Sequence, residues 1–355
     1  MKNIFLFITF LASIFTLSAQ DSTNKGNTTW GGFAETYYQY DFNNPAGGNI
    51  PLAYNHHRHN EFAVNLVLIT INYSSNKVRG NLGLQTGTYP EANYAAELQI
   101  FRHLYDANIG YKLAKKLWLD AGIFGSSHIG FEYAVSKNNW TLTRSLSAEN
   151  TPYYEAGAKL TYEIDSHFTV SALVLNGWQN IRETNSNKAL GSQIVWKPND
   201  KITVNYSTFY GNEKPDSLKQ MRFLNDVYTQ VQLTKKLGII AGIDIGTEQA
   251  LDSSGTKLSG NYNIWYNPTL ILRYAFTKKF AMAARCEMYK DEHGVILTGK
   301  NVMGYSVNMD YMPHTNIALR LEGRSLMAED KIFTDADGNA TGLRTSVTAS
   351  MAISF

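Results

Sequence analysis

Histidines gather at one place in the sequence, and imidazole nitrogens are common zinc ligands. His56, His57 and His59 lie at the junction of a polar segment and a predicted strand. Alternation along a strand directs His57 and His59 to one face and His56 to the other. Three imidazoles divided between two faces do not converge on one ion. The segment therefore favours a solvated structural role over a metal site.

A second segment, 335–339, begins like the calcium-binding loop of an EF-hand. Asp335, Asp337 and Asn339 alternate with small residues, as ligands do in that loop. The third acidic position before the glycine is missing, however, and the twelfth position is Ser346 where the loop requires glutamate. A polar turn in a long loop is the better interpretation, with calcium as the alternative.

Nucleophilic chemistry has only weak support. Ser126, Ser127 and His128 are neighbours in the sequence, but adjacency does not create the geometry of a catalytic triad. We find no nucleophile motif, glycine-rich phosphate loop or metal-binding His-Glu helix pattern. The single cysteine, Cys286, cannot form an intramolecular disulfide and lies on an apolar strand face. The sequence thus predicts neither an enzyme nor a bound cofactor or metal.

The composition is unusual for a water-soluble enzyme. Of 355 residues, 44% are hydrophobic and only 17% are charged, against about a quarter in average proteins. The formal net charge is +2, which offers no electrostatic basis for binding nucleic acid and argues against a strongly ion-selective pore. Outside one N-terminal run, no stretch approaches the roughly 18 apolar residues of a membrane-spanning helix.

The N-terminal run has the organisation of a secretory signal peptide. Lys2 precedes the apolar segment 4–17, and the small residues Ser18 and Ala19 follow it. We expect a signal peptide at 1–19, a short linker at 20–29 and one transmembrane domain at 30–355. The protein is then exported through the periplasm.

Hydrophobic periodicity identifies the secondary structure. In 153–164, every even position is apolar or aromatic, whereas the odd positions, among them Glu155 and Lys159, are mostly polar or small. Helical spacing would mix these two sets, but a strand separates them onto opposite faces. The same alternation recurs in 280–288, 317–324 and 347–355, where the polar positions include Arg285, Glu287, Arg320, Glu322 and Arg324.

The connections between predicted strands alternate in length. Seven are short polar turns, near 74–77, 114–116, 165–167, 198–200, 235–236, 277–279 and 313–315. Eight are longer, near 43–57, 89–104, 127–150, 179–188, 212–221, 250–260, 291–299 and 326–343.

Together these connections join sixteen strands, with short turns at one end and long loops at the other. That arrangement is typical of an antiparallel outer-membrane β-barrel with periplasmic turns and extracellular loops. A soluble β-sandwich does not require it. We therefore predict an all-β transmembrane barrel of about 16 strands in contact with outer-membrane lipid.

Aromatic residues cluster near the predicted strand ends, where barrels carry interfacial girdles. We expect this role for Tyr37, Tyr38, Tyr40, Phe42, Trp265, Tyr266 and Tyr311. The last strand ends in Phe355, and an aromatic C-terminus of this kind resembles the signal by which outer-membrane proteins are recognised for assembly.

Several short segments carry a family resemblance. They are RHNEF at 58–62, GTY at 87–89, ANYAAE at 92–97, LWLDAG at 117–122, HIGFE at 128–132, NWTLTRS at 139–145, AENTPYYE at 148–155 and NGWQN at 176–180. Together they resemble the β-barrel porin-2 family (OmpL-like porins) of Bacteroidetes. The resemblance implies an outer-membrane channel in a Gram-negative bacterium, and it carries over neither a substrate nor a catalytic residue.

In general porins of sixteen strands, the third long loop commonly folds into the lumen and narrows it. Here that loop is 127–150, and we predict that Glu132, Arg144 and Glu149 face charges on the barrel wall. The lumen-facing candidates on the wall are Glu155, Lys159, Arg285, Glu287, Arg320, Glu322 and Arg324. Charges of both signs across a pore select weakly by charge. Alternatively, the same charges only tie the loop to the wall by salt bridges.

The leading functional hypothesis is a porin that admits small hydrophilic solutes by passive diffusion, since sixteen strands enclose an aqueous channel. Many general porins form trimers through their outer walls, so a homotrimer is an open alternative to a monomer. A second functional hypothesis is a non-channel barrel that acts as an adhesin or structural protein through its extracellular loops. A third is an outer-membrane enzyme such as a lipase.

Overall fold

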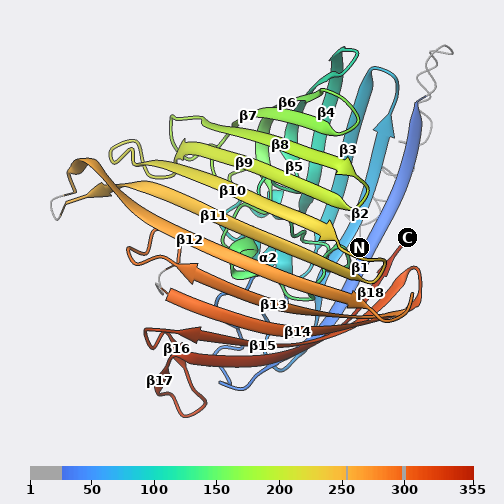
Figure 1. Ribbon diagram of the computed structural model, residues 1–355. Helices are drawn as coiled ribbons and strands as arrows, with labels where there is room; N and C mark the ends of the chain where they lie inside the picture. Colours follow the sequence, from blue (N-terminus) through green and yellow to red (C-terminus); the bar gives the residue numbers. More distant parts are fainter. Residues whose placement is uncertain (1–25, 253–254, 298–300) are drawn as a thin grey trace, which may run out of the picture.

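The computed structural model describes residues 26–252, 255–297 and 301–355 (Figure 1). Sixteen strands of these residues form a closed antiparallel barrel, which confirms the predicted fold class and strand number. The strands are β1 (Asn27–Asp41), β2 (Phe62–Ser74), β3 (Val78–Thr86), β4 (Leu104–Ala114), β5 (Leu117–Phe124), β6 (Glu155–Glu163), β7 (Phe168–Leu175), β8 (Ala189–Asn199), β9 (Ile202–Asn212), β10 (Met221–Gln232), β11 (Leu237–Leu251), β12 (Lys257–Ala275), β13 (Phe280–Lys290), β14 (Asn301–His314), β15 (Ile317–Ala328) and β18 (Leu343–Ser354).

Each strand pairs with its neighbours in sequence, and β1 closes the ring by pairing with β18. The seven short turns lie where the sequence predicted them. The connection between β15 and β18 contains a small separate hairpin of β16 (Phe333–Thr334) and β17 (Ala340–Thr341). The expected signal peptide, 1–19, and linker residues 20–25 lie outside the described residues, and β1 begins slightly before the domain boundary expected at 30.

The helical segments of the described residues are short and lie inside the ring of strands (Figure 1). They are α2 (Thr88–Asn93), α3 (Leu146–Glu149) and the 3₁₀ turns η2 (Phe101–His103) and η3 (Ser136–Asn138). No helix in the described part of the chain is long and apolar enough to cross a membrane.

The barrel is apolar outside and polar inside. On β14, Val307 points outward and is 51% exposed, whereas the next residue, Asn308, points inward and is fully buried. Asn308 pairs with the buried Glu322 of β15, and Val307 pairs with Gly323. Such a distribution would be unfavourable in water, because it exposes large side chains and buries charged ones. It fits a barrel whose outer wall faces lipid.

Two of the aromatic residues predicted for the girdles lie inside the barrel instead. Tyr37 is 2% and Trp265 1% exposed, and Trp265 packs in a core cluster that includes Leu146 of the third long loop. Successive residues of a strand face opposite sides, so an aromatic run near a strand end divides between lipid and lumen. The inward position of Trp265 requires glycine opposite it, because a Cβ at Gly246 would lie 2.0 Å from the indole Cζ2.

Candidate pore and its inner loop

The connection between β5 and β6, residues 125–154, lies within the barrel, and we call it the inner loop. Its backbone is bonded to wall carboxylates on the far side of the ring. The amide of Thr143 donates to Glu322 Oε2 at 2.6 Å, and the amide of Leu146 donates to Glu287 Oε2 at 2.5 Å. These contacts position the loop across the lumen and against β13 and β15.

Arg285 of β13 lies at the centre of this attachment. Its buried guanidinium donates to the carbonyl oxygen of Thr143 at 2.6 Å. It also forms ion pairs with Glu322 at 3.1 Å, Glu287 at 3.3 Å and Glu132 of the inner loop at 3.9 Å. A buried charge is tolerated only when it is paired and hydrogen-bonded, as it is here. Of the three predicted loop residues Glu132, Arg144 and Glu149, only Glu132 forms an ion pair with the wall among the described residues.

The other two predicted arginines of the wall bind in the same region. Arg324 forms an ion pair with Glu287 at 2.6 Å. Arg320 pairs with Asp310 of β14 at 2.7 Å and donates to the carbonyl oxygen of Ser136 at 2.6 Å. Sequence reasoning missed Asp310, although the alternation of 301–314 places it on the polar face.

The partners of Arg144 and Glu149 come from loops. The guanidinium carbon of Arg144 lies 3.4 Å from the centre of the Tyr153 ring. Glu149 Oε2 accepts hydrogen bonds from the Tyr153 hydroxyl at 2.7 Å and from the amide of Tyr54 at 2.8 Å. Glu149 therefore connects the inner loop to the first long loop, whereas the contact of Arg144 with Tyr153 stays within the inner loop.

Ser127 and His128 both contact Glu155 of β6, but not in the arrangement of a nucleophile and its base. The Ser127 hydroxyl donates to Glu155 Oε1 at 2.9 Å, and His128 Nδ1 lies 2.6 Å from the same oxygen. The other ring nitrogen of His128 bonds to the carbonyl oxygen of Thr208 at 2.8 Å. No ring nitrogen is left to activate the serine.

The three clustered histidines occupy separate structural positions in the first long loop. His56 Nε2 lies 3.0 Å from Glu35 Oε2, and His59 Nδ1 accepts the amide of Asp41 at 3.0 Å. His57 Nδ1 lies 3.1 Å from the carbonyl oxygen of Tyr54.

The segment that begins with Asp335 forms the tip of the β16–β17 hairpin. Asp335 Oδ1 accepts the amides of Asp337 at 3.0 Å and Asn339 at 2.8 Å, as in a polar turn. Within the described residues, no group of three or more His, Cys, Asp or Glu side chains is arranged to hold a metal ion.

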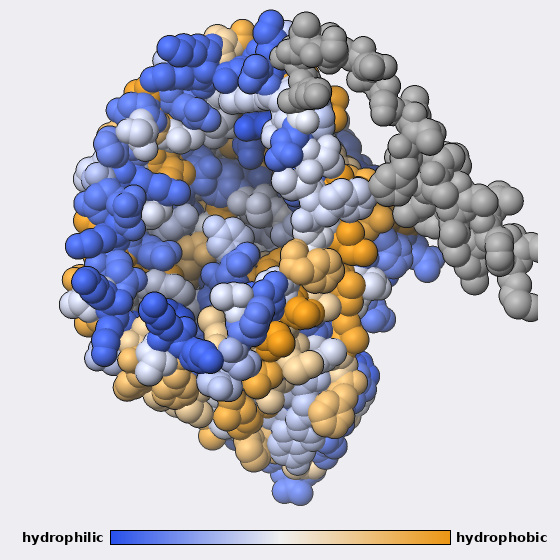
Figure 2. All heavy atoms as spheres, turned by 90° about the vertical axis from the view of Figure 1, so that its right-hand side faces the viewer, coloured by the Kyte–Doolittle hydropathy of each residue, from blue (hydrophilic) through white to orange (hydrophobic). Residues whose placement is uncertain are grey.

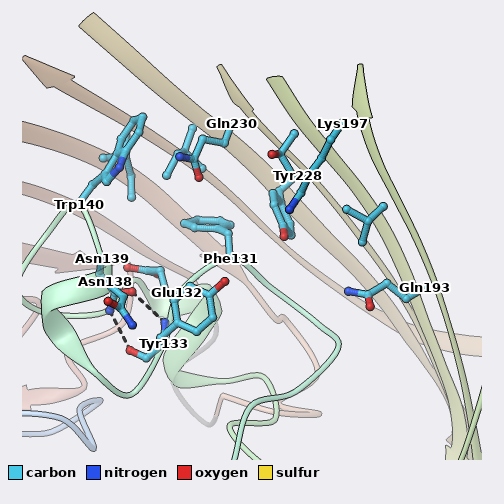
Figure 3. Close-up of a pocket in the computed structure, with 14 residues that line it drawn as sticks. Phe131, Glu132, Tyr133, Asn138, Asn139, Trp140, Gln193, Lys197, Tyr228 and Gln230 are labelled. Atoms are coloured by element: carbon cyan, nitrogen blue, oxygen red, sulfur yellow. Dashed lines mark hydrogen bonds between the residues drawn. The ribbon is translucent and has the colours of Figure 1, made fainter. Parts of the chain in front are cut away.

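A cavity of about 350 Å³ lies between the inner loop and the wall of β8–β12 (Figure 3). Figure 3 shows Phe131, Tyr133 and Trp140 of the loop across from Lys197, Tyr228 and Gln230 of the wall. A second cavity of about 210 Å³ shares four lining residues with the first and also contacts residues farther along the barrel. The shared residues are Glu132, Tyr133, Gln193 and Tyr228, and the second cavity adds, among others, Arg144, Glu155 and Lys159.

Glycines on β11 allow the loop aromatics to lie against the wall. A Cβ at Gly238 would lie 2.5 Å from Trp140 Cη2, and one at Gly242 would lie 2.8 Å from Phe131 Cε1. Both approaches are too close for any side chain. Sequence reasoning missed these aromatics because loop residues have no periodicity. It also missed Lys197, although alternation along 189–199 places Lys197 on the same face as Gln193.

At the long-loop end, Glu213 is a carboxyl group whose titration falls near neutral pH. Glu213 lies in the connection that follows β9. Its Oε1 accepts a hydrogen bond from the amide of Trp178, in the connection between β7 and β8, at 2.9 Å. Burial raises the pKa of Glu213 to about 7.

We expect the loops around Glu213 to open more readily as pH rises. The folded loop favours the protonated form of Glu213. Glu213 therefore stabilises the folded loop fully below its ordinary pKa of 4.5, and this stabilisation is lost as pH rises through about 7. Between about pH 5.5 and 7, protease cleavage in 176–188 and 213–220 should increase by about tenfold, and Glu213→Gln should remove this dependence. The control is Glu163→Gln, an exposed acid at the short-turn end of β6. A pH dependence that persists in Glu213→Gln would contradict the assignment.

A closed barrel with an apolar exterior, a polar interior and a loop folded inside it defines the class of porin-type β-barrels. Residues 27–355 match the family described as "Putative beta-barrel porin-2, OmpL-like". The chain belongs to this family.

Solved structures share the fold at low sequence identity. The outer membrane channel DcaP of Acinetobacter baumannii has a TM-score of 0.64 at 10% identity, covering 93% of this chain and 97% of that one. An anion-selective porin from Comamonas acidovorans has a TM-score of 0.62 at 8% identity, covering 93% and 100%. OmpT of Vibrio cholerae, in a trimer form, has a TM-score of 0.58 at 8% identity, covering 93% and 99%. No curated protein sequence is similar enough to count as a relative.

Proposed function

We propose that this protein forms a water-filled channel through which small hydrophilic solutes diffuse passively across a bacterial outer membrane. One observation carries the proposal: a lipid-type exterior encloses a hydrophilic interior that is open at the short-turn end. Figure 2 shows that end, where hydrophilic side chains gather along the left and upper rim of a hollow. The cavities beside the inner loop continue from this side of the barrel. Membership of a porin family supports the same function.

In this proposal the inner loop is the constriction, and charged residues of the barrel wall hold it in place. Arg285, Glu287, Glu322 and Arg324 fasten the loop to one side of the lumen. The passage is then the space left between the loop and the opposite wall. Solutes therefore meet the exposed loop face and the inner face of β6–β11, while the fastening charges stay buried.

Liposome swelling with solutes of graded size tests the channel. Vesicles that contain the refolded protein should swell fast in glycerol or arabinose and slowly in a trisaccharide, since a narrowed pore excludes by size. Protein-free vesicles and vesicles with heat-unfolded protein are the controls. If the smallest solute does not enter, the channel is refuted, and the adhesin or structural hypothesis takes its place.

We further propose a homotrimer in the membrane, packed through the outer walls. The support is one similar structure, OmpT, which is described in a trimer form. Chemical cross-linking in detergent, followed by gels of unheated samples, should give a band of three chains. A single-chain band at every cross-linker concentration would exclude the trimer.

A further inference from the structure

Two lysines on the inner wall have no acidic partner. Lys159 of β6 lines the smaller cavity and Lys197 of β8 lines the larger one. Among the described residues, neither ammonium group lies within ion-pair distance of a carboxylate. The amine of Lys159 instead lies 4.8 Å from the centre of the Phe124 ring. Both lysines therefore present free positive charge to the passage.

The acids that line the same cavities are bonded to other groups of the protein. Glu132 accepts hydrogen bonds from the amide and hydroxyl of Ser145 and faces Arg285 at 3.9 Å. Glu155 lies 2.6 Å from His128 Nδ1. Each carboxylate is thus directed into the protein and away from the passage.

Three further acids lie on neighbouring wall positions. Asp120 of β5 is opposite Lys159 in the strand register, but its carboxylate forms an ion pair with Arg79 at 2.5 Å. Asp106 of β4 accepts the amide of Gly125 at 2.9 Å and lines neither cavity. Glu163 lies at the short-turn end of β6 and is also absent from both linings.

Arg144 adds a third cation at the inner end of the passage, and its attraction to the buried Glu149 offsets part of that charge. It lines the smaller cavity with Lys159, yet it is only 4% exposed. Its guanidinium packs on Tyr153 and donates to the carbonyl oxygen of Ala148 at 3.0 Å. Its Nε has no hydrogen-bond partner among the described residues. A buried donor without an acceptor is costly, and an anion in the cavity would supply one.

The strand register separates the lysines along the wall. Lys159 pairs with Leu173, which pairs with Gly191 of β8. Gly191 precedes Lys197 by six residues, which corresponds to about 20 Å along a strand. Lys197 lies near the short turn, so the cations form successive positions from the mouth inward.

We propose that this passage is selective for small anions, both inorganic and carboxylate, with Lys197, Lys159 and Arg144 as successive contacts. The inference rests on the proposed channel function and adds its solute class. The near-zero net charge of the chain does not oppose it, because the field in a pore depends on the few unpaired charges that line it.

Reversal potentials in a potassium chloride gradient across a planar bilayer test the proposal. We expect the wild-type channel to favour chloride over potassium by about threefold, as a few unscreened lysines beside a water-filled path would produce. The double variant Lys159→Gln/Lys197→Gln should bring the ratio to about 1. The matched control is Lys235→Gln/Lys278→Gln, which removes two charges from exposed short turns and should leave the ratio unchanged.

Circular dichroism and heat-dependent gel mobility establish that each variant is folded. A wild-type channel that favours potassium, or a double variant with unchanged selectivity, overturns the inference and leaves the channel intact. A barrel that carries no current in any salt overturns the proposed function, and the inference with it.

Discussion

Replacing Arg285 with methionine should free the inner loop and lower the stability of the barrel. Methionine fills similar space but leaves Glu322, Glu287 and Glu132 without their shared cation. Breaking a buried ion pair by removing one partner costs about 3–5 kcal/mol, because the remaining charges stay buried and unpaired. The hydrogen bond to the carbonyl oxygen of Thr143 is lost as well. Among the described residues, Arg285 forms three hydrogen bonds and one ion pair with the inner loop.

Two measurements check this prediction. Urea unfolding should show a decrease of about 3 kcal/mol or more in the free energy of unfolding, and single-channel recording should show larger, more variable currents as the loop moves. Cys286→Met is the matched control, since it changes the next residue of β13 on the lipid face. Arg324→Met should shift both readouts in the same direction but less, because Arg324 pairs with one carboxylate, Glu287. Unchanged stability and conductance in Arg285→Met would show that the loop does not depend on this cluster.

Replacing Val307 with arginine should strongly impair membrane insertion. Val307 lies mid-strand on β14, pairs with Ala284 and Gly323, and is exposed on the outer wall. An arginine that faces lipid near the membrane midplane costs about 2–4 kcal/mol. The cost falls to about 0–1 kcal/mol near the interface, so the effect depends on depth.

Equilibrium unfolding from lipid vesicles measures this penalty. The matched control is Ile317→Arg, at the first residue of β15 beside a short turn, where the penalty should be small. The lipid-facing assignment of the wall requires a large difference between the two variants. Equal unfolding free energies, or two barrels that are stable in water without detergent, would contradict it.

The barrel itself could be predicted because its information is local. The alternation of Leu319 and Leu321 with Arg320 and Glu322 identifies a strand and its two faces without knowledge of any partner. Short polar turns are equally local, since a few turn-forming residues are enough to reverse the chain. Together the strands and turns determined the fold class, the strand number and the end at which the long loops lie.

The same alternation explains the error at the girdles. Trp265 and Tyr266 are adjacent, so the strand directs them to opposite sides and only one can face lipid. Their position near a strand end predicted both for the girdle. Trp265 instead packs inside the barrel, where Gly246 on the neighbouring strand leaves room for its indole ring.

The sequence by itself therefore determined the barrel, its polar inner face and the loop to consider as a constriction. Only the tertiary structure decided which charges meet: Arg285 contacts Glu132 across 153 positions of sequence, while Arg144 stacks on Tyr153 nearby. It also decided that Lys159 and Lys197 line the two cavities without an ion-pair partner among the described residues. The physical reason is that barrel closure and loop docking join segments far apart in the chain. Such contacts depend on three-dimensional packing, which a two-residue periodicity does not encode.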